Sequence, residues 1–325
     1  MIVYSVSAFV GSICISVYLL KMLVSLRKFF LREGYDLAKR YGNGTWAIVT
    51  APTSATGYGF AVQLARSGFN IILIGRDIEM LNKLRDLLIL RYGVKVRTVI
   101  ADFRNAGDID FYTELLRQIE DLDISIVIHA VGLVALSRKF HQQTAERNRQ
   151  CMIVNMFSPV LLSQHLIPRL QHRYHRSAIV IIGGENANQP IPGMAISSGA
   201  KAFLRQFSVA ASCEYEDKID IMTVQPLAVK KVLGSSNKTK DQSESVFVID
   251  SERFARASLK QLGHERCTSG HWIHMVQSWV YSIFPEELKL GFWTKVLPRQ
   301  MKNSGNSENK KNGTDSVEED ARKNN

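Results

Sequence analysis

The stretch of sequence that decides the fold reads GTWAIVTAPTSATG and runs from Gly44 to Gly57. Within it, Trp46–Thr50 is a short apolar run of the kind that forms a strand buried on both faces. Small and turn-forming residues come next, and they lead into a helix-length segment that contains Phe60–Arg66. A strand, a turn and a helix in immediate succession predict the first unit of an α/β domain.

The same alternation continues along the chain. Further apolar runs, rich in Val and Ile, predict buried strands at Asn70–Ile74, Val94–Ile100, Ile124–His129, Ala178–Ile182 and Ile219–Val224. Helix-length segments separate them, including Met80–Tyr92, Phe111–Leu122 and Lys201–Glu214. We therefore expect a doubly wound parallel sheet of the Rossmann type over residues 44–300, which include a C-terminal extension. Residues 301–325 are polar and are predicted to form a disordered tail.

The N-terminal segment is predicted to anchor the chain in a membrane. Ile2–Leu20 contains no charged residue, and basic residues come directly after it at Lys21, Arg27, Lys28 and Arg32. Such a run crosses most of a hydrocarbon core, and its positive flank places the main domain in the cytosol. We expect residues 1–21 to form an uncleaved transmembrane anchor and residues 22–43 a basic linker. The alternative is a buried or interfacial helix.

Charge and cysteine content agree with that placement. The chain carries 41 basic and 30 acidic residues, a net charge of +11, but the basic residues form no stripe interleaved with aromatic residues. A nucleic-acid partner is therefore not predicted, and an anionic membrane surface is the better match. Four cysteines that are far apart in the sequence predict reduced, mostly buried thiols in a reducing compartment: Cys14, Cys151, Cys213 and Cys267.

Several motifs carry a resemblance to a known family. The stretch quoted above resembles the opening of short-chain dehydrogenase/reductase (SDR) enzymes, whose first turn reads T-G-x-x-x-G-x-G. Further matches cover nearly the whole chain beyond the anchor: Asp102-Phe103, Val131-Gly132, Ile153-Val154-Asn155, Ser198–Phe203, Glu214-Tyr215 and Gly270–His274. The branch it is most similar to is the membrane-bound one of very-long-chain 3-oxoacyl-CoA reductases and hydroxysteroid dehydrogenases. Within that branch it most resembles a hydroxysteroid dehydrogenase-like protein regarded as inactive.

The resemblance implies NADP(H) as cofactor, held by residues of the first turn and of the next two strand ends. Ala51 and Ala55 occupy the first two glycine positions of the motif, and each methyl group adds bulk where ligand or helix should pack. Arg76 matches the basic partner of the ribose phosphate and Asp102 the residue that meets adenine; the alternatives are an exposed arginine and a capping aspartate. We therefore expect NADP(H) binding to be weak or lost. The candidate cofactor residues are Thr50, Thr53, Gly57, Arg76, Asp102 and Lys201.

The family's catalytic residues are only half present. A tyrosine moves the proton, a lysine four residues later assists it, a serine thirteen residues earlier polarises the carbonyl, and an asparagine completes the relay. Asn155 and Lys201 are retained, but Ser197 and Gly184 occupy the tyrosine and serine positions. A serine hydroxyl is shorter and much less acidic than a phenol of pKa about 10. Chemistry by the family mechanism is therefore expected to be impaired.

Two histidine patterns admit other interpretations. His129 near the nicotinamide could donate a proton, but a histidine bonded to backbone at a strand end is the ordinary interpretation. His264, Cys267, His271 and His274 offer zinc-like spacing, which packing of a structural segment explains as well. No metal site is predicted.

The sequence leaves two functions open. The first is a catalytically impaired or inactive SDR relative that acts by binding a partner protein, a lipid or steroid, or residual nucleotide. The alternative is an NADPH-dependent reductase of long-chain 3-oxoacyl-CoA or steroid ketones with an altered proton relay. The last four residues, Arg322–Asn325, resemble a dilysine-type retrieval signal, so the endoplasmic reticulum membrane is the expected location. The family also implies homo- or hetero-dimers formed through Gln150–Arg169 and Lys201–Glu214.

Overall fold

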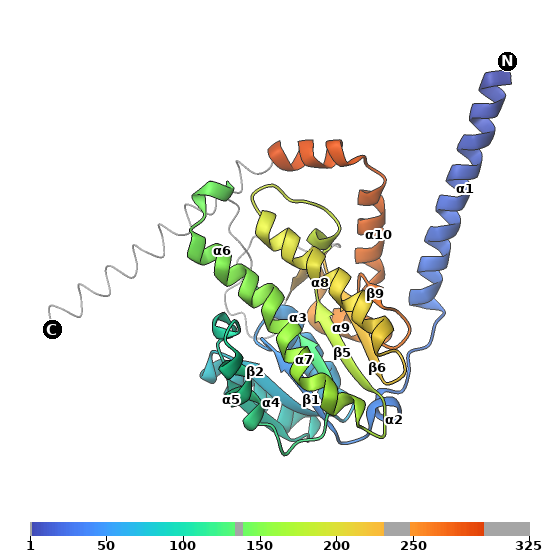
Figure 1. Ribbon diagram of the computed structural model, residues 1–325. Helices are drawn as coiled ribbons and strands as arrows, with labels where there is room; N and C mark the ends of the chain where they lie inside the picture. The colour runs from blue at the N-terminus through green and yellow to red at the C-terminus, as the bar shows by residue number, and fades with distance from the viewer. Residues whose placement is uncertain (1, 134–138, 231–247, 296–325) are drawn as a thin grey trace.

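The structure is a computed structural model that describes residues 2–133, 139–230 and 248–295 (Figure 1). The predicted tail at 301–325 and the retrieval signal at Arg322–Asn325 lie outside the described residues.

Within the described ranges, seven parallel strands form the central sheet, in the order β3-β2-β1-β4-β5-β6-β9. The order reverses between β1 and β4, as in a doubly wound fold, and the predicted Rossmann-type sheet is confirmed. Long apolar runs explain the strands, because both faces of the sheet are covered by helices. The strands are β1 Trp46–Thr50, β2 Asn70–Gly75, β3 Val96–Ile100, β4 Ile124–His129, β5 Ser177–Ile182, β6 Ile219–Val224 and β9 Cys267–Thr268.

Helices cover both faces of the sheet and enclose two apolar cores. One face packs against α3 Ala55–Arg66, α4 Ile78–Tyr92 and α9 Ser251–Leu259, and the other against α5 Ile109–Arg117, α7 Ser158–Gln171 and α8 Ala195–Glu214. The other elements of the described ranges are α6 Ala145–Met152, the π-helix η3 Ile153–Phe157, α10 Trp272–Ser282, the short helices η1 Phe103–Asn105, η2 Phe140–Gln142 and η4 Glu185–Ala187, and the strand pair β7 Val229–Lys230 and β8 Ile249–Asp250.

The N-terminal segment forms one long helix, α1 Ile2–Phe30, which stands beside the domain (Figure 1). Tyr4–Phe30 is long and apolar enough to cross a membrane, and none of its most apolar part is buried in the protein. The helix continues past the predicted anchor boundary at residue 21. The stretch Ala145–Gln171 also has sufficient length and apolarity, but half of its apolar window is buried, as in a core helix.

The predicted linker at 22–43 is largely helical. It contains the end of α1 and the short helix α2 Leu37–Tyr41, whose Tyr41 is fully buried. The carboxylate of Asp220, at the start of β6, accepts hydrogen bonds from Arg40 Nε at 2.7 Å, Tyr41 Oη at 2.7 Å and Arg176 Nη2 at 2.8 Å. These hydrogen bonds hold the segment after α1 against the start of β6.

The cysteines only partly match their prediction. All four are free thiols, but only Cys151 is buried. Cys14 lies on the outer surface of α1 and Cys213 near the exposed end of α8, so these two thiols are exposed.

Candidate functional site

A cavity of about 270 Å³ lies at the carboxyl ends of β1, β2 and β3, beside the point where the strand order reverses. This is the edge where open α/β sheets bind ligands. Three predicted cofactor residues, Thr53, Arg76 and Asp102, line it together. The other lining residues are Ala51, Gly75, Asp77, Ala101, Phe103, Arg104, Val131, Gly132, Leu133 and Val154.

Two further predicted cofactor residues shape the cavity without lining it. The hydroxyl of Thr50 accepts hydrogen bonds from the backbone N–H groups of Ala130 at 3.0 Å and Val131 at 3.1 Å, which ties the end of β1 to the end of β4. Gly57 lies in the first turn of α3, where a Cβ atom would come within 2.3 Å of the Ala51 carbonyl oxygen. Glycine is therefore required there for the turn to fold back on the helix.

The turn itself carries strain at the first glycine position of the family motif. Ala51 has a φ of +46°, a left-handed conformation that no other described non-glycine residue adopts. Left-handed backbone costs an L-residue with a Cβ roughly 1–2 kcal/mol. The chain thus keeps the backbone path of a glycine turn although it has lost the glycine.

Replacing Ala51 with glycine should therefore stabilise the protein. We expect the free energy of unfolding to rise by about 0.5–1 kcal/mol, since relief of strain exceeds the extra freedom that glycine gives the unfolded chain. Denaturant unfolding measures this. Ala55→Gly is the matched control, because Ala55 begins α3 without a positive φ and should lower stability or leave it unchanged. A loss of stability in Ala51→Gly would contradict the strain argument.

The charged residues of the cavity are partly engaged with one another. Asp102 caps η1, because its carboxylate accepts a hydrogen bond from the Arg104 backbone N–H at 3.0 Å, and it also accepts one from Arg104 Nε at 2.8 Å. Burial opposes ionisation of Asp102, but Arg104 and the charge of Arg76 prevail and lower its pKa. Arg76 itself is exposed. A carboxylate flanked by two guanidinium groups fits the phosphate-bearing adenosine half of NADP(H).

Sequence reasoning missed Arg104, although a basic residue two positions after Asp102 in a loop was available as a signal. NADP(H), when bound, would supply the hydride. Arg76, Asp102 and Arg104 are the residues placed to hold its adenosine end.

Lys201 and Asn155 meet at the rim of the same cavity. A Cβ atom on Gly132 would lie 3.3 Å from Asn155 Oδ1 and 3.6 Å from Lys201 Nζ, so both polar groups face one cavity-lining glycine. Asn155 Oδ1 accepts a hydrogen bond from the Leu133 backbone N–H at 3.2 Å, and its Nδ2 donates to the Leu133 carbonyl at 2.8 Å. Asn155 is at the centre of the π-helix η3, a distortion common at functional sites.

The retained lysine is partly buried, and its electrostatics are perturbed. Lys201 Nζ donates a hydrogen bond to the Ile182 carbonyl at 3.1 Å, and burial lowers the pKa of its ammonium group to about 8. Buried lysines titrate near neutral pH when desolvation outweighs nearby negative charge. Lys201 can therefore exchange a proton in the physiological range.

Ser197 and Gly184, which the resemblance assigns to the two hydroxyl positions, lie at the start of α8 and directly after the end of β5. Ser197 is in the first turn of α8, one turn before Lys201, and is 4% exposed. Gly184 comes after β5 with extended backbone, and a Cβ there would meet Asn186 Oδ1 at 2.5 Å. Tyr58 and Tyr174 do not take over the role: Tyr58 is buried on α3 near Glu252, and Tyr174 is 93% exposed beyond α7.

A buried carboxylate beside this site was also missed. Glu185 comes directly after Gly184, is 7% exposed and accepts a hydrogen bond from Ser278 Oγ of α10 at 2.7 Å. Burial raises its pKa. A charged residue after two glycines at a strand end was the only sequence signal for it.

The histidines have structural partners. Burial lowers the pKa of His129 to about 3, so the ring is neutral, and its Nε2 bonds to Ser163 Oγ at 2.9 Å rather than to backbone. His264 stacks on Tyr35 at 4.1 Å, and His271 caps α10. No three metal-binding side chains gather anywhere in the described ranges.

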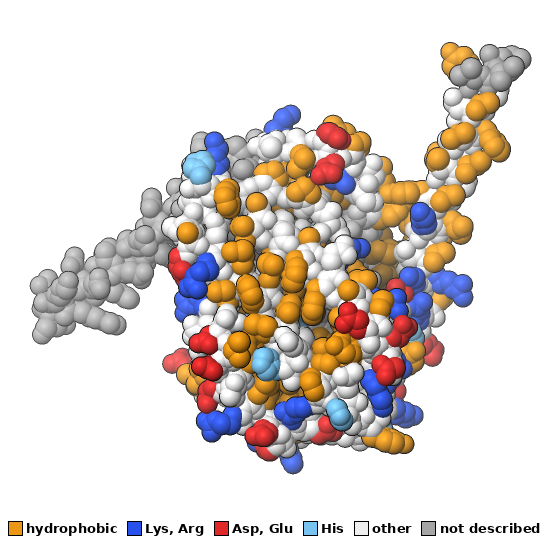
Figure 2. All heavy atoms as spheres, in the orientation of Figure 1, with side chains coloured by type: hydrophobic (Ala, Val, Ile, Leu, Met, Phe, Trp, Pro, Cys, Tyr) orange, Lys and Arg blue, Asp and Glu red, His pale blue; other side chains and the backbone are white. Residues whose placement is uncertain are grey.

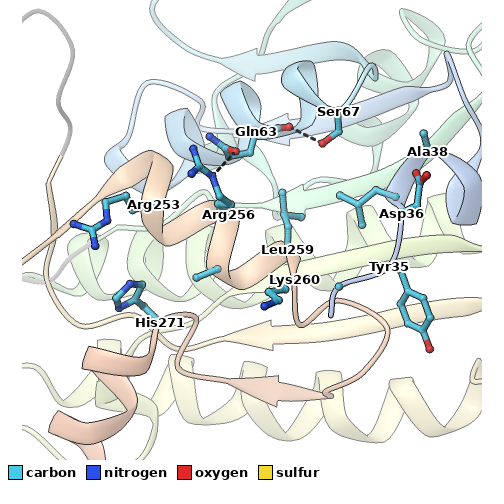
Figure 3. Close-up of a pocket in the computed structure, with 13 residues that line it drawn as sticks. Tyr35, Asp36, Ala38, Gln63, Ser67, Arg253, Arg256, Leu259, Lys260 and His271 are labelled. Atoms are coloured by element: carbon cyan, nitrogen blue, oxygen red, sulfur yellow. Dashed lines mark hydrogen bonds between the residues drawn. The ribbon is translucent and has the colours of Figure 1, made fainter. Parts of the chain in front are cut away.

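A larger cavity of about 560 Å³ lies elsewhere, between α9 and the chain that leads from the anchor (Figure 3). Arg253 and Arg256 of α9 line it together with Lys260, the residue after the helix, and Tyr35 and Asp36 lie on the opposite side. None of the predicted site residues contributes to it, so it is separate from the candidate active site.

Comparisons with known proteins identify the family. The short chain dehydrogenase family profile matches residues 45–242. Very-long-chain 3-oxoacyl-CoA reductase-A of Danio rerio is 30% identical over 86% of this chain and 86% of its own length. The Neurospora crassa very-long-chain 3-oxoacyl-CoA reductase is 29% identical over 83% of this chain and 82% of its own.

Solved structures show the same fold. A 7β-hydroxysteroid dehydrogenase superposes with a TM-score of 0.69 at 18% identity, over 80% of this chain and all of that one. A short-chain dehydrogenase from Sphingobium yanoikuyae in complex with NADPH gives a TM-score of 0.53 at 30% identity, over 57% of this chain and 72% of that one. The chain belongs to the short-chain dehydrogenase family.

Proposed function

We propose that this protein is a catalytically impaired SDR relative that binds NADP(H) weakly and acts mainly by binding. Its main domain would lie on the cytosolic side of the endoplasmic reticulum membrane, and its ligand would be a lipid or steroid. The proposal rests on one observation: the site keeps two of the family's catalytic residues and lacks the other two. Lys201 and Asn155 both lie near Gly132. Ser197 and Gly184 are the residues that the family resemblance assigns to the two hydroxyl groups that would touch a carbonyl oxygen.

The rate losses expected from the two missing hydroxyl groups favour impaired over full activity. A positioned acid or base typically contributes about 10²–10⁴ in rate, and one carbonyl-polarising donor about 10²–10³. The two losses do not add, but either would leave an ordinary reductase slow. The left-handed Ala51 in the cofactor turn supports weak dinucleotide binding as well.

The test uses the full chain in detergent micelles or lipid nanodiscs. NADPH fluorescence measures dinucleotide affinity, and NADPH consumption with a long-chain 3-oxoacyl-CoA measures turnover. Weak binding with turnover at least 10²-fold below that of an active family member supports the proposal. Turnover within tenfold of that relative rejects it.

A second function rests on a different observation. The curated relatives are named very-long-chain 3-oxoacyl-CoA reductases, which favours an active reductase over a binding protein. Lys201 supplies a route to activity, because a buried ammonium with a pKa of about 8 can give a proton to a substrate oxygen as hydride arrives.

This reductase hypothesis predicts a pH profile. Reduction consumes the protonated acid, so kcat/KM should be constant below pH 8 and fall about tenfold per unit above it. In Lys201→Arg that break should disappear from the accessible range, since arginine stays protonated. Rates measured from pH 6 to 10 give the profile. A profile without a break near pH 8 in the parent protein would eliminate Lys201 as the proton donor.

We also propose dimerisation through α7 and α8. Hydrophobic side chains gather on the face of the molecule shown in Figure 2, where α6, α7 and α8 run. On η3 and α8, Phe157 and Phe203 are 49% and 41% exposed, and Phe203 stacks on Phe207. Exposed aromatic residues on adjoining helices are typical of a subunit contact. The partner is a second copy or a related chain.

A further inference from the structure

The C-terminal helices lie against the anchor helix. The rings of Tyr18 on α1 and Trp279 on α10 are 4.7 Å apart, and Tyr18 Oη lies 2.9 Å from Ser282 Oγ. Nearer the domain, Phe30 contacts Trp272 with the ring centroids 5.7 Å apart. Helix α10 therefore runs beside the second half of α1, as Figure 1 shows.

The contact between α1 and α10 determines which part of α1 extends beyond the rest of the protein. Beyond Tyr18, the stretch Ile2–Val17 extends past the end of α10 and is not covered by the domain. At about 1.5 Å per residue it is roughly 24 Å long, shorter than a hydrocarbon core of about 30 Å. The end of α10 therefore lies beside the part of α1 that would complete a membrane span.

The segment after α10 has a surface that suits such an environment. Residues 286–295 form a helix that runs across the top of Figure 1, transverse to α1. Phe284 lies two residues before this helix, and Leu288 and Phe292 are four residues apart within it, so the latter two share one face. Their exposed fractions are 50%, 62% and 57%, and Ile283 beside them is 53% exposed. We call Ile283, Phe284, Leu288 and Phe292 the C-terminal apolar face.

Aromatic and charged residues around this face match a membrane interface. Of the four tryptophans in the chain, three lie at Trp272, Trp279 and Trp293. Trp293 Nε1 donates a hydrogen bond to Tyr281 Oη at 2.6 Å, and Lys289 Nζ lies 5.4 Å from the Tyr281 ring, which fixes the last helix on α10. Tryptophan and tyrosine concentrate at the boundary between hydrocarbon and water.

The charged side chains of residues 283–295 cancel one another. Glu286 and Glu287 offset Lys289 and Lys295. Attraction to this face would therefore come from its apolar area and not from anionic headgroups.

The same helix borders a further cavity, next to the start of α8. Leu290 lines an apolar cavity of about 520 Å³ together with the loop after Gly184 and the start of α8. The other lining residues are Asn186, Ala187, Asn188, Gln189, Pro190, Ile191, Pro192, Ala195, Ser198, Gly199 and Ala202. Ser198 comes directly after Ser197, so this cavity adjoins the site of the missing tyrosine.

We propose that the C-terminal apolar face inserts into the cytosolic leaflet beside α1 and holds the apolar cavity that Leu290 lines against the bilayer. The occupant of the face is a lipid bilayer surface. The proposal rests on the membrane location proposed above but not on whether the protein catalyses a reaction. A ligand with a long apolar chain would then reach the cavity from the membrane without crossing water.

The experiment places the full chain in nanodiscs that contain brominated phosphatidylcholine and measures quenching of tryptophan fluorescence. The test variant is Phe284→Glu, Leu288→Glu and Phe292→Glu together. The matched control carries Leu90→Glu, Ile109→Glu and Tyr174→Glu, which are exposed apolar residues of the main domain. Both variants add three charges to exposed positions, and thermal unfolding checks that both fold.

We expect quenching in the test variant to fall about twofold, because Trp293 leaves the leaflet while Trp279 stays beside Tyr18 of α1, and quenching in the control to match the parent. Equal quenching in all three proteins overturns the proposal. A second copy of the chain on this face would give two chains per nanodisc and no loss of quenching, which also overturns it. High salt should leave the parent's quenching unchanged; a large loss would assign the contact to headgroup charge instead of apolar insertion.

Discussion

The double variant Gly184→Ser with Ser197→Tyr is expected to reduce 3-oxoacyl-CoA about 10²–10⁴ times faster than the parent protein. The backbone and the partner residues are already in place. Position 197 is one helical turn before Lys201 and on the same face of α8. Lys201 and Asn155 remain at the cavity rim. In Ser197→Tyr, the longer side chain can reach a substrate carbonyl, and its hydroxyl beside the Lys201 ammonium is more acidic than that of serine.

The two substitutions differ in the room available to them. Gly184 has extended backbone, so serine introduces no strain, and the one close contact of its Cβ is the terminal oxygen of Asn186, a side chain that can rotate. Ser197 is 4% exposed, so the tyrosine ring must displace its neighbours, and thermal unfolding checks that the variant folds. NADPH consumption measures the gain.

Single variants are the controls for this prediction. Each alone should recover only part of the rate, because the two hydroxyl groups act on one oxygen. If the double variant binds NADPH like the parent but gains no rate, the hypothesis that these two positions limit chemistry is wrong. If NADPH does not bind either, adding Ala51→Gly separates the cofactor turn from the chemistry.

Strands of this fold could be predicted closely because they are buried on both faces. The runs at Trp46–Thr50, Ile124–His129 and Ile219–Val224 match the observed strands to the residue. Uninterrupted Val and Ile runs between polar segments leave few alternatives. The end of α1 was harder, because basic residues after Leu20 resembled a solvated linker. Lys28 and Arg32 instead pair with Glu265, a partner more than 230 residues away in the sequence.

For the candidate site, the family motifs could predict which residues lie there but not their conformations or hydrogen-bond partners. They placed Thr53, Arg76 and Asp102 on one cavity. They gave no sign that Ala51 takes a left-handed conformation, that Thr50 is fully occupied with β4, or that Ser163 is the partner of His129. These features depend on contacts between distant segments, which a local pattern does not contain. The burial that perturbs Lys201 and Glu185 is of the same kind.

The largest expected change in stability also comes from charged residues that are far apart in the sequence. Asp220→Ala should lower the free energy of unfolding by about 3 kcal/mol, because it leaves Arg40, Arg176 and Tyr41 without their shared acceptor. We place the loss at the lower end of the range for buried pairs, since the Arg40 and Arg176 side chains keep 20% and 28% of their exposure. Thermal and denaturant unfolding of the full chain in micelles measure it.

The pH dependence of this effect has a definite sign. Burial opposes ionisation of Asp220, but hydrogen bonds from Arg40, Arg176 and Tyr41 outweigh it and lower the pKa below 3.8. The stabilisation is therefore complete above about pH 4 and is lost as pH falls through the folded-state pKa. The stability gap between the parent and Asp220→Asn should shrink between pH 7 and pH 3. The exposed neighbour Asp217 provides the control, because Asp217→Ala removes a carboxylate without removing the cluster. A gap that stays constant with pH would mean that packing, and not charge, holds α2 to the sheet.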